Sequence, residues 1–126
     1  LAPLPNVTLL SGISDDELYR LYKSSALQFL PFTGAAGNNS MNEGLAMGCP
    51  VVTNILNTAY RMNTQREIAF VFDSNSLEAA MKACDQLVEH MQQFPEQMVQ
   101  SAQEAVMEFD WSSIGQQTLN LYNNLL

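Results

Sequence analysis

Basic residues are scarce in this sequence. Only five lysines and arginines stand against thirteen aspartates and glutamates, which gives a net charge of −8 at pH 7. A nucleic-acid interface needs a basic stripe that displaces counterions from phosphates. An anionic membrane surface likewise attracts clusters of basic residues. We therefore expect neither nucleic acid nor a membrane surface to be a partner of this chain.

Long apolar runs and metal-binding patterns are missing as well. No apolar segment approaches the roughly 20 residues that a helix needs to cross a bilayer, so we expect no transmembrane segment. The two cysteines, Cys49 and Cys84, lie far apart and have no neighbouring Cys or His at zinc-ligand spacing, so no metal site is predicted. Their apolar surroundings indicate buried free thiols in a reducing compartment, the cytoplasm.

The sequence does contain an alternation of short β-prone and helical segments. Strands are predicted near residues 7–10, 26–31, 50–54 and 69–72, and helices near 14–24, 40–47, 75–91, 95–109 and 110–125. The stretch 55–67 is predicted to be mostly loop. This order predicts one α/β domain over residues 1–126, with a Rossmann-like parallel sheet of about four strands and helices on both faces. Phe109 and Trp111 are expected to fill the core between the last two helices.

One stretch has the features of an anion-binding site. The apolar strand ALQFLPF is followed by a loop of small residues and then by a helix that begins near Ser40. Gly and Asn let such a loop bring backbone amides close to a ligand, and a helix N-terminus favours negative charge. Parallel sheets bind ligands at this end of their strands. The candidate residues of this loop are Gly34, Ala35, Ala36, Gly37, Asn38, Asn39 and Ser40.

Glu43 has two possible roles on spacing alone. It stands three residues after Ser40, so the pair fits a capping box in which both side chains satisfy backbone amides at the helix start. That role requires no ligand. Alternatively, its carboxylate accepts hydrogen bonds from two vicinal sugar hydroxyls, as acidic residues do for nucleotide ribose.

Three segments resemble motifs of GT-B-fold retaining glycosyltransferases, the group that includes glycogen and sucrose synthases. The segment NVTLLSGISDDELYRLYKSSALQFLPF is similar to a strand–helix–strand unit of their C-terminal domain. The segment NEGLAMGCPVVTN resembles the motif E-A-(M/L)-A-x-G-x-P-V-V, and FDWSSIGQQTLNLY resembles the final F-S-W…Y segment. The resemblance covers nearly the whole chain and implies the later part of the nucleotide-sugar-binding domain of such an enzyme.

The resemblance also implies a function and roles for individual residues. Glu43 would hold the donor ribose, and the loop from Gly34 to Ser40 would face the diphosphate and the sugar. The donor substrate would be a nucleoside diphosphate sugar, with no further cofactor, and the sugar would pass to an acceptor hydroxyl in polysaccharide or glycoconjugate assembly. The family usually has a first Glu where this sequence has Ala35, and the resemblance identifies no catalytic residue here.

The differences between this sequence and the family motifs leave two alternative functions open, and they also imply a missing part of the domain. The chain could be a non-catalytic binding or scaffold module of the same fold, or a protein similar to sugar-nucleotide epimerases. The family has further strand–helix units before Val7, so an upstream part of the same polypeptide is expected to complete the donor site. Without that part, the edge of strand ALQFLPF is expected to pair with residues 7–10 or to cause self-association.

Overall fold

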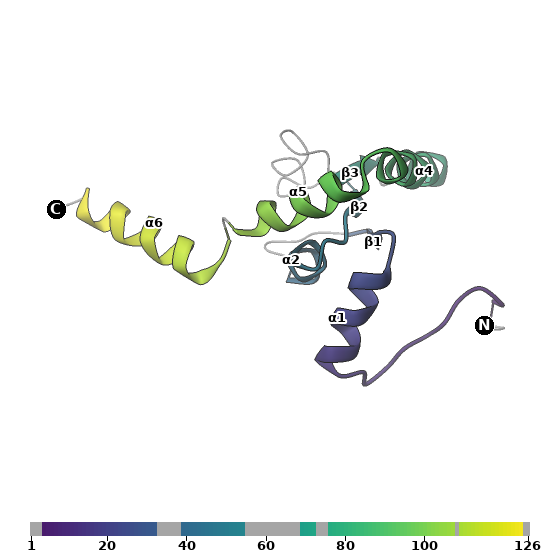
Figure 1. The fold of residues 1–126 in the computed structure, drawn as a ribbon, viewed down its shortest axis with the longest axis horizontal. Helices are drawn as coiled ribbons and strands as arrows, with labels where there is room; N and C mark the ends of the chain where they lie inside the picture. The colour runs from purple at the N-terminus through teal and green to yellow at the C-terminus, as the bar shows by residue number, and fades with distance from the viewer. Residues whose placement is uncertain (1–3, 33–38, 55–68, 73–75, 108, 125–126) are drawn as a thin grey trace.

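The computed structural model describes residues 4–32, 39–54, 69–72, 76–107 and 109–124. Five helices and three strands are found in these ranges (Figure 1). The helices are α1 (Asp15–Ser24), α2 (Asn39–Ala46), α4 (Leu77–Gln93), α5 (Pro95–Met107) and α6 (Trp111–Asn123), and the strands are β1 (Gln28–Leu30), β2 (Val51–Asn54) and β3 (Ala69–Phe72). The predicted loop over residues 55–67 lies outside the described ranges.

The sheet is smaller than the sequence predicted. Strands β1, β2 and β3 lie side by side in that order, and both pairs are parallel. Residues Val7 to Leu10, predicted as the first strand, are exposed and do not form a strand. The prediction of a four-stranded, Rossmann-like GT-B sheet is therefore wrong. The structure is rich in helix and has a three-stranded sheet in the ranges that it describes.

Strand propensity alone does not create a strand at residues 7–10. A β-prone segment becomes a strand only where a neighbour accepts its hydrogen bonds and covers its side chains. Leu9 is 92% exposed, and Val7 and Leu10 are 49% and 51% exposed, so no apolar side chain of this segment is buried. The nearest free edge in sequence belongs to β1, and it is followed by Pro31, which has no backbone N–H to donate.

Strand β2 is the centre of the core. Its neighbouring residues Val51 and Val52 are both fully buried, and they belong to two separate apolar clusters. This is the alternation of side chains expected along a strand. The cluster around Val51 contains Met41, Leu45, Ala102 and Ala105 from α2 and α5. The cluster around Val52 contains Phe72, Ala80, Ala83, Leu87 and Met98, mostly from β3 and α4.

Three helices begin directly after a residue whose side chain caps them. The Ser14 hydroxyl accepts a hydrogen bond from the Glu17 backbone N–H at 3.3 Å, where α1 begins. Ser76 caps α4 by accepting from the Ala79 N–H at 3.0 Å. Asp110 caps α6 by accepting from the Ser113 N–H at 2.7 Å. Each cap satisfies one of the N–H groups that a helix start leaves unpaired.

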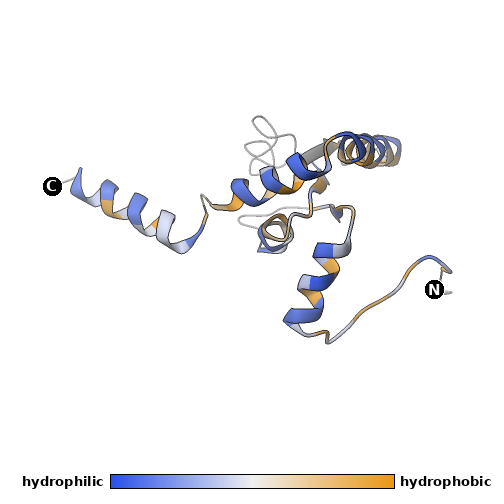
Figure 2. Ribbon diagram, in the orientation of Figure 1, coloured by the Kyte–Doolittle hydropathy of each residue, from blue (hydrophilic) through white to orange (hydrophobic). Residues whose placement is uncertain are grey.

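Helix α6 contributes nothing to the core. It extends away from the sheet, and none of its residues is buried (Figure 1). Trp111 is 89% exposed and Phe109 is 43% exposed, so the prediction that they fill the core is wrong. The helix nevertheless carries apolar residues among its polar ones (Figure 2). Its sequence period therefore indicated a helix correctly but could not indicate what that helix packs against.

Helix α2 approaches β1 so closely that a side chain at Gly44 would collide with the side-chain amide of Gln28. A Cβ atom built on Gly44 would lie 2.3 Å from the Gln28 Nε2 and 2.6 Å from its Cδ. Gln28 is itself buried between the strand and the helix. No ordinary carbon contact is that short, so any side chain at this position would have to displace the Gln28 amide.

We predict that Gly44→Ala lowers the free energy of unfolding by about 1–3 kcal/mol, because it overpacks this contact. Gly115→Ala is the matched control. A Cβ at Gly115 would meet no atom within 4 Å, and it lies within α6, where Ala is favoured over Gly by about 1 kcal/mol. Urea unfolding of both variants measures the difference. A Gly44→Ala protein as stable as the Gly115→Ala protein would contradict the close packing of α2 on β1.

Candidate functional site

The candidate site is at the end of the sheet where β1 and β2 finish and α2 begins. Phe32 follows β1 and is held by the side chain of Asn54, the last residue of β2. The Phe32 N–H donates to the Asn54 Oδ1 at 2.8 Å, and the Asn54 Nδ2 donates back to the Phe32 carbonyl. The Thr53 hydroxyl donates to the Leu30 carbonyl at 2.7 Å. These bonds fix the direction in which the chain leaves β1.

The predicted loop is described only at its end. Residues Gly34, Ala35, Ala36, Gly37 and Asn38 lie outside the described ranges. Asn39 and Ser40 are the first two residues of α2, and both are exposed. Of the predicted site residues, the structure therefore brings Asn39, Ser40 and Glu43 together on one helix.

The capping-box interpretation of Glu43 is wrong. A capping residue stands outside the helix with non-helical backbone angles. Ser40 instead lies inside α2, which already begins at Asn39. It therefore cannot be the N-cap that the box requires. Glu43 is consequently past the first turn and is not needed to satisfy an amide at the helix start.

Glu43 lies close to two other polar side chains. Tyr22 of α1 is hydrogen-bonded to the Ser40 side chain, and it experiences the negative charge of Glu43. Burial raises the pKa of the Tyr22 phenol, the Glu43 charge raises it further, and the bond to Ser40 lowers it. Glu43 is half-buried, and among the described residues no hydrogen bond or ion pair involves its carboxylate. Its oxygens therefore remain available as acceptors for a ligand.

Sequence reasoning missed the residue that positions α2. Gln28 is 7% exposed, and its Nε2 donates to the Met41 carbonyl at 3.1 Å and to the Cys49 carbonyl at 3.2 Å. Met41 is near the start of α2, and Cys49 follows its end. The Gln28 Oε1 has no hydrogen-bond partner among the residues that the structure describes. The signal was present in the sequence, because Gln28 is the single polar residue of ALQFLPF.

Neither metal-binding clusters nor membrane-spanning helices occur in the described ranges. No group of three or more His, Cys, Asp or Glu side chains there could hold a metal ion. No helix there is both long and apolar enough to cross a bilayer.

Comparison of the chain with protein-family models, with curated protein sequences and with solved structures gives no match.

The Cys49 thiol, which follows the end of α2, stays protonated at neutral pH. It is 1% exposed, it forms no disulfide, and burial raises its pKa from 9.0 to about 11. Cys84 is also a free thiol but is only partly buried. A neutral thiol in the folded chain and a thiolate in the unfolded chain differ in proton binding. Stability must therefore depend on pH above the ordinary thiol pKa.

We predict that this thiol costs the protein stability in alkali. Below pH 9 the folded and the unfolded chain both keep the thiol proton, so Cys49 does not lower the free energy of unfolding there. The free energy of unfolding falls as the pH rises toward the folded-state pKa of about 11. By about pH 10.5 the loss should reach roughly 2 kcal/mol. Urea unfolding of wild type and Cys49→Ala at pH 8 and 10.5 measures this loss, because the variant lacks the Cys49 thiol and keeps Cys84, whose pKa burial also raises. Equal losses in wild type and Cys49→Ala would show that Cys49 ionises freely in the folded protein.

Proposed function

We propose that this chain provides part of the donor site of a glycosyltransferase and binds the ribose of a nucleoside diphosphate sugar through Glu43. The observation that supports this most directly is the environment of Glu43. Its carboxylate is half-buried and has no bonded partner among the described residues, and it is not used for helix capping. A carboxylate of this kind can accept hydrogen bonds from two vicinal hydroxyls at once.

The surrounding segment supports the proposal in a second way. The motif that resembles E-A-(M/L)-A-x-G-x-P-V-V runs through the end of α2 and into β2. Gly48 has a φ of 79° and ends the helix in the left-handed region, as its place in the motif requires. Pro50, Val51 and Val52 are all fully buried. Each conspicuous residue of the motif thus has a structural role except Glu43, which is left for a ligand.

In the proposed reaction, a sugar passes from the nucleoside diphosphate to an acceptor hydroxyl, and the diphosphate leaves. Backbone amides at the start of α2 would stabilise the charge of the leaving diphosphate. The upstream part of the polypeptide would provide the acceptor site and the basic partners of the diphosphate. The described ranges contain only three lysines and arginines, Arg20, Lys23 and Lys82.

A non-catalytic binding module is the second candidate. The sequence favours it at one position, because Ala35 replaces the acidic residue that usually grips the donor sugar in the glycosyltransferases that the sequence resembles. Such a module would still bind the nucleotide through Glu43 but would not transfer the sugar. Nucleotide binding therefore tests the shared part of both candidates, and sugar transfer by the whole polypeptide separates them.

The binding test compares a ribonucleotide with its 2′-deoxy counterpart. Binding of UDP and dUDP, ADP and dADP, and GDP and dGDP can be followed by NMR chemical-shift titration, which detects millimolar affinity. If Glu43 holds both ribose hydroxyls, removal of the 2′-hydroxyl should weaken binding of the preferred nucleotide. Glu43→Gln should weaken the same nucleotide by roughly 2–4 kcal/mol, about thirtyfold or more. The two losses should not add, because both remove the same hydrogen bonds.

Glu89→Gln, which neutralises an exposed carboxylate of α4, is the matched control and should leave the titrations unchanged. Additive losses from Glu43→Gln and the deoxy-nucleotide would place the ribose elsewhere. Failure of all three nucleotides to bind at millimolar concentration would reject the proposed function.

A further inference from the structure

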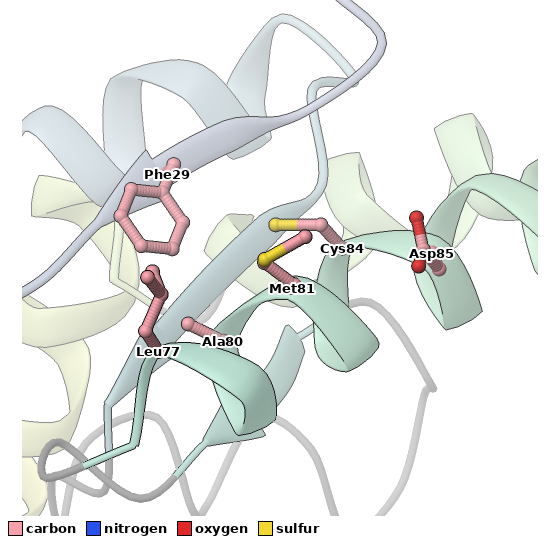
Figure 3. A pocket seen from close by; sticks show the side chains of 6 residues that line it. All are labelled: Phe29, Leu77, Ala80, Met81, Cys84 and Asp85. Carbon is pink, nitrogen blue, oxygen red and sulfur yellow. The ribbon is translucent and has the colours of Figure 1, made fainter.

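An apolar hollow lies between strand β1 and helix α4, away from Glu43 and α2. It has a volume of about 270 Å³ and is lined by Phe29, Leu77, Ala80, Met81, Cys84 and Asp85 (Figure 3). Phe29 comes from β1, and the other residues come from α4. Leu77 and Met81 are 78% and 60% exposed, so large apolar side chains remain in contact with water here. A second hollow continues along α4 past Glu78 and Lys82.

The open side of β1 forms one wall of this hollow. The Gln28 N–H donates to the Pro50 carbonyl, and the Leu30 carbonyl accepts from the Thr53 hydroxyl, so the backbone groups of both residues face β2. Successive residues of a strand direct their backbone groups to opposite sides. The N–H and C=O of Phe29 therefore face away from β2, where the described ranges contain no further strand. This edge offers one donor and one acceptor to another extended segment.

The Phe29 side chain connects this free edge to the hollow. Its ring stacks on Phe72 at 5.5 Å between centroids, which holds it on the α4 face of the sheet. It nevertheless remains 45% exposed. A strand added beside β1 would place the side chain opposite Phe29 on this same face, above the hollow. Pro31 lacks an N–H and limits such a pairing to a few residues.

Charge around the hollow indicates the kind of partner. Asp85 stands in its lining and Glu78 beside it, against one cation, Lys82. The whole chain carries a net charge of −8, so a second copy would be repelled. We propose that the β1 edge and the α4 hollow together bind a short extended segment of another polypeptide. That segment has apolar side chains at alternate positions and lysines or arginines at its ends.

The test uses the whole 126-residue chain and two labelled synthetic peptides. One peptide, KKTLTLTKK, has basic ends, and the other, EETLTLTEE, has acidic ends. Binding is measured by fluorescence anisotropy. The basic peptide should bind, and the acidic peptide should bind at least about tenfold more weakly, because its ends face Asp85 and Glu78. Absence of binding by the basic peptide, or equal binding of both, would overturn the proposal.

Two methionine variants distinguish binding of the peptide in the hollow from a general attraction of the basic peptide to an acidic protein. Met81→Lys places a charge in the hollow, and Met107→Lys makes the same change on α5 at a residue of nearly equal exposure, 64%. Met81→Lys should weaken binding of KKTLTLTKK by about tenfold or more, and Met107→Lys should have little effect. Both proteins should keep the wild-type circular dichroism spectrum. Equal weakening in the two variants would show that the peptide does not occupy the hollow.

A third peptide tests the pairing with β1. N-methylation of alternate residues in KKTLTLTKK removes the N–H groups on one side of the strand and leaves its side chains and charges intact. If the peptide pairs with the Phe29 backbone, methylation on one of the two sides should weaken binding severalfold more than methylation on the other. Unchanged affinity in both methylated forms would contradict strand pairing.

Discussion

The buried amide of Gln28 ties strand β1 to helix α2, and the positions of the surrounding residues depend on it. Its Nε2 bonds to carbonyls near both ends of α2, and its side chain lies where a Cβ of Gly44 would stand. These bonds are costly to lose, because the buried amide and carbonyl groups that make them cannot replace them with bonds to water. The helix is thereby held against the sheet at a distance at which a side chain at Gly44 would displace the Gln28 amide.

The geometry of the candidate site depends on this contact between Gln28 and α2. Once α2 is fixed, Ser40 and Glu43 lie beside Tyr22 of α1, and Glu43 keeps a carboxylate with free acceptor capacity among the described residues. On the neighbouring side, Asn54 and Thr53 hold the end of β1 by side-chain hydrogen bonds. The polar residues of β2 therefore have structural roles, whereas Glu43 has none of that kind. This contrast supports a ligand-binding role for Glu43.

The local pattern of the sequence predicted elements well and their assembly poorly. The helices predicted near residues 14–24 and 110–125 begin where the structure has them, because their caps, Ser14 and Asp110, act within four residues of themselves. The predictions of a strand at residues 7–10 and of a buried Trp111 were wrong, because each depends on a neighbour that the local sequence does not specify. Ser40 was mistaken for a cap because its spacing to Glu43 is correct even inside a helix. The role of Gln28 was visible only as a polar residue in an apolar strand.

Hydrogen exchange in Gln28→Met tests the central claim most directly. Methionine matches glutamine in length and fills the same space but donates no hydrogen bond, so it removes both bonds that the Gln28 amide makes to the Met41 and Cys49 carbonyls. Amides of α2, residues 42–46, should exchange faster by about tenfold, while those of α4, residues 83–90, should exchange as in wild type. Unchanged exchange throughout α2 would contradict the claim that the Gln28 amide holds this helix, and with it the position of Glu43, in place.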